Sequence, residues 1–106
     1  MAYPIFVNDG WVSPDKAHVS VKDIGFLRGY GIFDFFRIMD GQAIFLSDHL
    51  DRFLSSAQKM GIEHRYSKAE LSQLILDLAK TSKDSCLGVK LVLTGGDSLN
   101  GFEPME

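Results

Sequence analysis

The chain has 106 residues, a formal net charge of −3 and an isoelectric point near 5.5, and its length suits one compact domain. The acidic balance and the scattered Lys and Arg residues argue against nucleic-acid binding, which depends on a basic face. No apolar run approaches the roughly 20 residues that span a membrane, and the N-terminus lacks a signal-peptide pattern. The single cysteine, Cys86, allows no internal disulfide. Together these features predict a cytoplasmic protein without membrane or nucleic-acid partners.

The first part of the chain predicts a β-hairpin followed by a loop. Apolar runs at 5–7 and 11–12 flank Asn8-Asp9-Gly10, where glycine can supply the positive φ of a tight turn. Residues 13–24 alternate only loosely, which favours a loop with a short edge segment. Residues 25–31 then hold three glycines in seven positions, a density typical of close backbone approach or of a loop with unusual φ.

A second hairpin follows. Residues 32–39 are rich in aromatic and β-branched side chains, and Asp40-Gly41 forms the turn before residues 42–45 return. By alternation, Arg37 shares a face of this strand with aromatic and apolar side chains. A charge in that setting either faces a cleft or a partner, or lies at an edge where the guanidinium reaches water.

Two helices and a strand complete the predicted fold. The first helix begins at Ser47 as N-cap and ends at Gly61, and its apolar face consists of Leu50, Phe53, Leu54, Ala57 and Met60. The second opens with a Ser67–Glu70 capping box, and residues 86–94 alternate as a strand. The order predicts an α+β domain with two amphipathic helices and an antiparallel sheet built from two hairpins plus a later strand.

The common signatures of catalytic sites are missing. His18, His49 and His64 lack the spacing of a zinc site, so no metal is expected. Neither G-x-S-x-G nor a P-loop motif occurs, and residues 25–31 do not match G-x-G-x-x-G. Arg52 lies on the first helix away from its apolar stripe. From the residues alone it is either a solvated side chain paired with Asp48 at i−4 or an anion site, because a guanidinium can bind phosphate bidentately.

A glycine loop, an aromatic–acidic pair, a hairpin ending in glycine and a helix reading His-x-Asp-Arg together resemble the N-terminal part of fold-type IV pyridoxal-phosphate enzymes. These include branched-chain aminotransferases, D-amino acid aminotransferases and aminodeoxychorismate lyases. The resemblance covers residues 5–96, and its motifs are Gly25-Phe26-Leu27-Arg28-Gly29-Tyr30-Gly31-Ile32-Phe33-Asp34, Arg37, Gly41, Asp48-His49-Leu50-Asp51-Arg52-Phe53, Ser56-Ala57 and Gly61-Ile62.

The resemblance implies a role for several residues. Arg52 matches the arginine that binds the phosphate of pyridoxal 5′-phosphate. Phe33 and Arg37 match residues of the substrate pocket. Arg28 lies in the loop that, in a family homodimer, reaches the partner subunit's active site. We hypothesise that Arg28 binds a substrate carboxylate there, and that Lys90 is a second residue that binds it.

The resemblance also implies what this chain lacks. Residues 1–96 match the small N-terminal domain and 97–106 the start of an interdomain linker, so the C-terminal catalytic domain with its lysine is absent. No catalytic residue is expected here, and the isolated chain should be inactive. Some relatives carry Arg-Gly after the strand and grip the substrate carboxylate there, whereas this chain has Gly95-Gly96.

The complete enzyme is expected to transfer an amino group between an amino acid and a 2-oxo acid. Two alternatives remain open. One is a lyase of the same family, similar to aminodeoxychorismate lyase. The other is a free-standing, non-catalytic domain that binds a partner or an anion.

Overall fold

The computed structural model describes residues 5–98. Its elements in chain order are β1 (Ile5–Val7), β2 (Gly10–Val12), the 3₁₀ turn η1 (Pro14–Lys16), α1 (Ile24–Arg28), β3 (Gly31–Met39), β4 (Gln42–Ala43), α2 (Leu46–Met60), α3 (Lys68–Ala79) and β5 (Cys86–Thr94).

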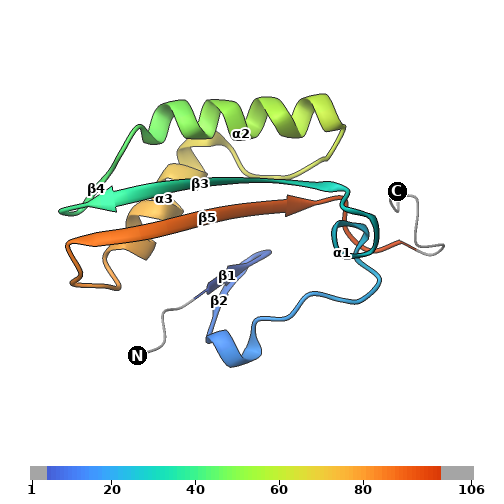
Figure 1. Cartoon of the computed structure of the whole chain (residues 1–106), viewed down its shortest axis with the longest axis horizontal. Coiled ribbons are helices and arrows are strands. Elements are labelled where there is room, and N and C mark those ends of the chain that lie inside the picture. The colour runs from blue at the N-terminus through green and yellow to red at the C-terminus, as the bar shows by residue number, and fades with distance from the viewer. Residues whose placement is uncertain (1–4, 99–106) are drawn as a thin grey trace.

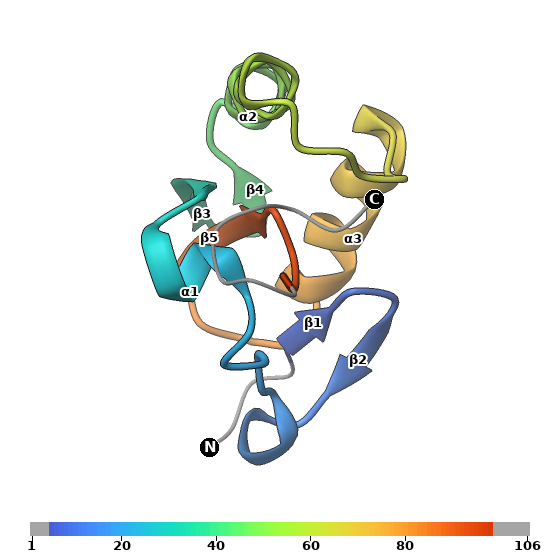
Figure 2. The same cartoon turned by 90° about the vertical axis from the view of Figure 1, so that its right-hand side faces the viewer.

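Strands β4, β3 and β5 form one antiparallel sheet in that order, while β1 and β2 pair as a separate hairpin. Helices α2 and α3 lie on the same side of β3 and β5, and the β1–β2 hairpin lies on the other side of β5 from α2 (Figures 1 and 2). The architecture is therefore α+β with antiparallel sheets, as the sequence predicts.

The core lies between the three-stranded sheet and its two helices. It is built from one alternating set of strand residues and the apolar stripes of the helices, namely Phe36, Ile38, Leu50, Ile75 and Val89. Successive strand side chains point to opposite faces, so the other face of β3 and β5 carries exposed Phe33, Phe35 and Val92. One face of the sheet is thus covered by helices, and the other leaves large apolar side chains accessible.

Helix α2 begins earlier than the sequence predicts. Phe45, in a left-handed conformation with φ 54°, precedes Leu46, and no side chain caps the helix. Leu46 packs against the core, so burial of its side chain favours the earlier start. The Ser47 hydroxyl instead accepts a hydrogen bond from Lys68 Nζ at 2.7 Å. The predicted Ser47 N-cap is therefore wrong, whereas the Ser67 capping box and the C-terminal Gly61 are confirmed.

The three-glycine segment is also more regular than expected. The sequence suggests an irregular loop, but Ile24–Arg28 form the short helix α1. The Asp23 carboxylate accepts the Gly25 N–H and caps the helix, and Gly29 ends it with φ 73°. Asp23 also accepts a hydrogen bond from the hydroxyl of Thr94, at the end of β5. The conformation therefore depends on a residue far along the chain.

The first hairpin turns on a different residue from the one expected. Val7 pairs with Gly10, so Asn8 and Asp9 form the turn, and Asn8 rather than Gly10 has the positive φ of 58°. Asparagine tolerates this region because its short polar side chain can bond locally. The second hairpin turns at Asp40-Gly41, as predicted.

The predicted linker begins inside the described part of the chain. Asp97 forms a β-bridge with Asp23, and the Ser98 N–H donates to the Lys22 carbonyl. The rest of the predicted linker, 99–106, lies outside the described residues, and the boundary at residue 96 stays a prediction.

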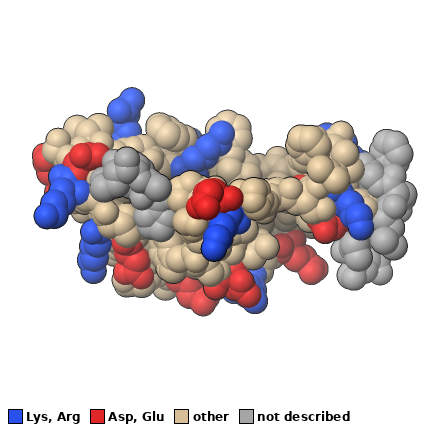
Figure 3. All heavy atoms as spheres, turned by 90° about the horizontal axis from the view of Figure 1, so that it is seen from below, with Lys and Arg blue, Asp and Glu red and all other residues tan. Residues whose placement is uncertain are grey.

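Charges of both signs are interspersed on the face seen from below in Figure 3. Within residues 5–98, no helix is long and apolar enough to cross a membrane. The same residues contain no group of three or more His, Cys, Asp or Glu side chains placed to hold a metal ion.

Candidate functional site

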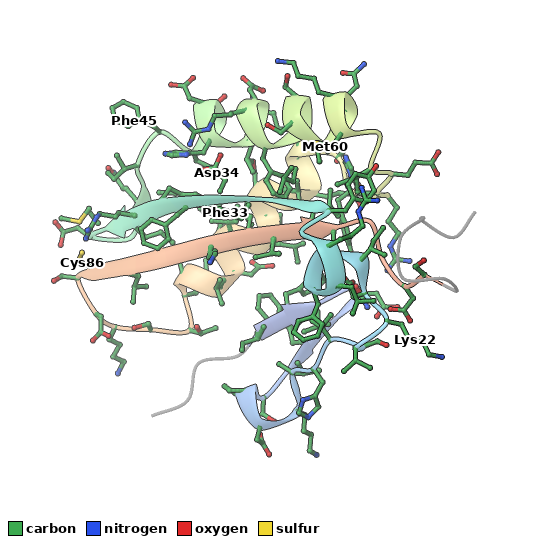
Figure 4. The ribbon with its side chains drawn as sticks, turned by 45° about the vertical axis from the view of Figure 1, so that its right-hand side comes forward. Lys22, Phe33, Asp34, Phe45, Met60 and Cys86 are labelled. Atoms are coloured by element: carbon green, nitrogen blue, oxygen red, sulfur yellow. The ribbon has the colours of Figure 1, made fainter. Side chains whose placement is uncertain are left out.

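A buried carboxylate lies between the sheet and helix α2. Asp34 follows Phe33 on β3 and points to the helix-covered face, where its side chain is only 3% exposed. Figure 4 places Asp34 beneath α2, with Phe45 projecting near the start of that helix. A buried charge requires charged or hydrogen-bonding partners, and α2 supplies them.

Arg52 of α2 holds this carboxylate with a two-point contact. Its Nε donates to Asp34 Oδ2 at 3.0 Å, and its Nη2 donates to Asp34 Oδ1 at 2.8 Å. The carboxylate partner of Arg52 is therefore Asp34 and not Asp48, which is the partner in one of the two interpretations of the sequence. The Arg52 side chain is 66% exposed, so one edge of the guanidinium is fixed by a buried anion while the remainder faces solvent.

His49, one helical turn before Arg52, completes the cluster. Its Nδ1 lies 2.9 Å from Asp34 Oδ1 and 3.1 Å from Arg52 Nη2. An ionised carboxylate only accepts hydrogen bonds and a guanidinium only donates them. With a proton on Nδ1 the imidazole therefore donates to the Asp34 carboxylate, and without that proton Nδ1 accepts from Arg52 Nη2. The imidazole also packs on Phe36, with ring centroids 5.2 Å apart, which fixes its orientation.

A hollow of about 320 Å³ adjoins the cluster and is lined by Phe45, Asp48, His49 and Arg52. Among the described residues, Arg52 Nη1 makes no hydrogen bond, so its two N–H groups are available to a ligand. An ionic ligand at this arginine would be an anion. Asp48 opposes such a ligand with its own charge, and Phe45 offers an apolar wall.

The pKa of the Asp34 carboxyl is lowered by its two partners on α2. Hydrogen bonds from Arg52 lower its pKa below the usual 3.8, with a further contribution from His49, while burial opposes the shift. The folded state thus holds the carboxylate more tightly in its ionised form than the unfolded state does.

Acid should destabilise the protein through this group. Because the folded pKa is depressed, the stabilisation from Asp34 is complete above about pH 4 and is lost as the pH falls through the folded pKa. Urea-unfolding midpoints measured down to about pH 2 should therefore fall less for Asp34→Asn than for the wild type. Glu63→Gln, at an exposed carboxylate, is the matched control and should follow the wild type. Identical acid dependence of Asp34→Asn and wild type would contradict the stabilising role of the pair.

A second hollow lies on the opposite face of the sheet. It measures about 200 Å³, and Phe33 and Lys90 line it together with glycines of the 25–31 segment. The Lys90 ammonium lies 4.8 Å from the centre of the Phe33 ring, a distance at which a cation is attracted to the ring face. The structure therefore brings together two of the residues predicted for the substrate pocket, one apolar and one cationic.

The other two predicted substrate residues lie away from this hollow. Arg28 ends α1, with its guanidinium 5.3 Å from the centre of the Tyr30 ring, and is not among the residues that line the hollow. Arg37 is exposed on the same sheet face as Phe33, four residues and about 13 Å further along the strand. Its Nη1 lies 3.8 Å from the Cys86 sulfur.

Gly95, which follows β5, occupies a crowded position. A Cβ there would lie 2.4 Å from Tyr30 Cδ2 and 2.7 Å from Ile24 Cδ1. An arginine at this position would therefore need a different local packing of Tyr30 and Ile24.

Gly95→Ala should lower the free energy of unfolding by about 1–3 kcal/mol, because the added methyl group overpacks this contact. The measurement is the urea-unfolding midpoint. The control is Gly10→Ala, since a Cβ at Gly10 has no atom within 4 Å. Equal stability of the two variants would show that Tyr30 and Ile24 relax freely around the new side chain.

Sequence patterns point to Arg52 but not to the two residues that hold it. Asp34 shares the helix-covered face of β3 with Phe36 and Ile38. A carboxylate at such a position needs a cationic partner. The alternation of β3 is therefore the one sequence feature that could have indicated Asp34 as a site residue. His49 lies at i−3 from Arg52, which places the two side chains side by side on the helix. The partner of Asp34 on α2 is a tertiary contact that no local pattern specifies.

The chain is similar to several known proteins. A family model described as amino-transferase class IV matches residues 31–106. A D-alanine aminotransferase of Staphylococcus aureus (strain N315) is 40% identical over 70 residues, which make up 66% of this chain and 25% of that protein. The chain spans about a quarter to a third of the length of such curated relatives.

Solved structures share the fold. The branched-chain amino acid aminotransferase of Escherichia coli has a TM-score of 0.89 and 21% identity, and the match covers 99% of this chain and 36% of that one. A second branched-chain amino acid aminotransferase, complexed with N-(5′-phosphopyridoxyl)-L-glutamate, has a TM-score of 0.88 at the same identity. The 4-amino-4-deoxychorismate lyase of Pseudomonas aeruginosa has a TM-score of 0.71 and 29% identity, with coverage of 85% and 32%. The match to the family model over residues 31–106, most of the chain, shows that the chain belongs to the class IV aminotransferase family.

Proposed function

We propose that residues 1–96 form the N-terminal domain of a pyridoxal-phosphate-dependent aminotransferase, that residues 97–106 begin its interdomain linker, and that Arg52 binds the phosphate of the cofactor. The observation that carries the proposal is the Arg52 guanidinium, fixed on one edge by Asp34 and open on the other to a hollow. Bidentate guanidinium contacts are a common mode of phosphate recognition. A branched-chain aminotransferase that shares the fold was solved with a phosphopyridoxyl compound.

The donor set fits a phosphate group. Arg52 lines the hollow, and among the described residues its Nη1 N–H groups make no hydrogen bond. Phe45, on the same hollow, can contact an apolar ring beside the phosphate. Bound pyridoxal phosphate would supply an electron sink for the substrate's α-carbon. This chain's own residues would bind and orient the phosphate. None of its lysines matches the family's catalytic lysine, so the chemistry would need a lysine from outside residues 1–106.

We further propose that the Phe33–Lys90 hollow receives the substrate. Phe33 would contact the substrate's side chain, and Lys90 would attract a carboxylate of the amino acid or the 2-oxo acid. Arg37, on the same exposed face, and Arg28, on α1, would contribute from outside the hollow. Within the part of the chain that the structure describes, β3 pairs at Phe33 and Asp34 with β5 alone. A ligand held by Arg52 could therefore approach Phe33 around this open edge of the sheet.

A change at Lys90 should alter substrate choice. In the protein of natural length, Lys90→Met should raise the KM for dicarboxylic substrates by about tenfold and leave the KM for neutral substrates nearly unchanged, because only the former lose a charge-assisted contact. Steady-state kinetics with both substrate classes checks this. Lys59→Met, at an exposed lysine of α2, is the control and should resemble the wild type. An equal rise for both substrate classes would contradict a carboxylate-binding role.

The family resemblance further supports a homodimer, in which the loop that carries Arg28 reaches the partner subunit. Gel filtration with light scattering on the protein of natural length tests this assembly. A dimeric mass supports it, and a monomer at micromolar concentration contradicts it.

The proposed activity is tested by adding an amino acid and a 2-oxo acid to the protein of natural length with pyridoxal phosphate. Amino-group transfer between them is the expected result, and chain 1–106 alone should give none. The likeness to the P. aeruginosa lyase at 29% identity favours a second candidate, pyruvate release from aminodeoxychorismate. Pyruvate release without transamination would favour the lyase. Absence of both activities would contradict the enzymatic proposal and favour a binding domain.

A further inference from the structure

Asp34 and Arg52 form an asymmetric pair, because the carboxylate is buried and the guanidinium is mostly in water. Their side chains are 3% and 66% exposed. An ion pair between two exposed chains is easily lost to solvent. Here the carboxylate is fixed by the sheet, and His49 Nδ1 lies 2.9 Å from the same Oδ1 that accepts from Arg52 Nη2.

The contact selects one edge of the guanidinium. Asp34 takes the Nε–H and one Nη2–H, which are parallel donors on the same side of the planar group. The Nη1 donors are left for a ligand in the hollow beside Phe45 and Asp48. Arginine otherwise has many rotamers, and ordering it at the moment of binding would weaken affinity. The pair to Asp34 orders it during folding instead.

We infer that Asp34 is a positioning residue, which holds the Arg52 guanidinium ready for a phosphate-bearing ligand. This inference rests on the proposed phosphate role of Arg52. The inference requires that the gain in affinity from an ordered Arg52 side chain exceed the loss from repulsion between the Asp34 carboxylate and the phosphate. Water screens that repulsion because the ligand-facing side of Arg52 is exposed, whereas the two-point contact acts directly on the donor geometry.

The test compares two ligands in the protein of natural length, pyridoxal phosphate and pyridoxal, which differ only in the phosphate group. Equilibrium titration followed by absorbance gives both affinities. Asp34→Asn should weaken binding of pyridoxal phosphate about five- to tenfold, as expected for loss of side-chain ordering, and leave binding of pyridoxal unchanged. Asp34→Glu, which keeps both acceptor oxygens and the charge, should retain most of the affinity.

A double-variant cycle separates positioning from other effects. In the Arg52→Ala background, Asp34→Asn should have no further effect on pyridoxal phosphate, because there is no guanidinium left to position. If Asp34→Asn does not fold, Arg52→Lys replaces it. This variant keeps the charge but cannot make the two-point contact, and it should weaken pyridoxal phosphate selectively as well.

The outcomes distinguish this inference from the proposed function. Unchanged or tighter phosphate binding in Asp34→Asn, alongside weaker binding in Arg52→Ala, would overturn the positioning role alone. An equal loss for pyridoxal and pyridoxal phosphate would overturn it too, since Asp34 would then act only on the fold. Wild-type affinity for pyridoxal phosphate in Arg52→Lys would mean that a positive charge suffices to bind the phosphate without the two-point contact to Asp34. That result would also overturn the positioning role. Wild-type affinity in Arg52→Ala would overturn the phosphate site itself.

Discussion

Replacing Arg52 with alanine in the protein of natural length is expected to weaken binding of pyridoxal phosphate by about 10- to 100-fold, because the phosphate loses charge-assisted hydrogen bonds. The buried Asp34 carboxylate loses its two-point partner in the same variant, so a modest loss of stability should accompany the change. Dialysis of the loaded protein followed by absorbance of the retained cofactor measures the affinity.

Arg65→Ala is the matched control for this prediction. The Arg65 side chain is also 66% exposed and pairs with a carboxylate, that of Asp9 at 3.6 Å, but it lies outside the hollow. Its loss should leave cofactor affinity unchanged. Equal affinity in Arg52→Ala and Arg65→Ala would mean that the phosphate is held by other residues of the protein.

Leu50→Ala is expected to lower the free energy of unfolding by about 2–5 kcal/mol, the usual range for deletion of a buried leucine side chain. Leu50 is 0% exposed and packs with Phe36, Ile38, Ile75 and Val89. It lies between His49 and Asp51 on α2, so its packing also determines the spacing between α2 and the strand that carries Asp34. Urea or thermal unfolding of the apoprotein measures the loss.

The control for the core is Leu76→Ala, since Leu76 is a leucine of α3 that remains 39% exposed. Its removal leaves little cavity, and the expected loss is well below that of Leu50→Ala. Comparable losses in the two variants would contradict the assignment of the core to the space between the sheet and its two helices.

The elements that the sequence predicts well are those specified by local chemistry. The capping box at Ser67 and Glu70 fixes the start of α3. Alternation over 86–94 predicts β5, and Asp40-Gly41 predicts the second hairpin turn. Each of these patterns lies within a short stretch of the sequence, so it can be recognised without knowledge of the tertiary fold.

The elements that the sequence misses depend on distant contacts. Helix α1 needs Asp23, which is held in place by Thr94 from the far end of the chain. The early start of α2 is favoured by packing of the half-buried Leu46 against the core. Intrinsic propensity is a weak prior that such packing overrides.

The same contrast applies to the candidate site. The family resemblance selects Arg52 and Phe33, and Lys90 is predicted as a second residue that binds a carboxylate. The pairing of Arg52 with Asp34, across 18 positions of sequence, requires α2 to lie over β3. The cation–π contact between Lys90 and Phe33 likewise requires the β3–β5 register. Candidate site residues can thus be predicted from the sequence, whereas the side chains that they contact are known only once the fold is known.

The most direct test of the account is a crystal structure of the protein of natural length with pyridoxal phosphate bound. The account predicts a phosphate oxygen within about 2.7–3.2 Å of Arg52 Nη1, with Asp34 still bound to Nε and Nη2. A phosphate held elsewhere, with Arg52 facing only solvent and Asp34, would contradict it.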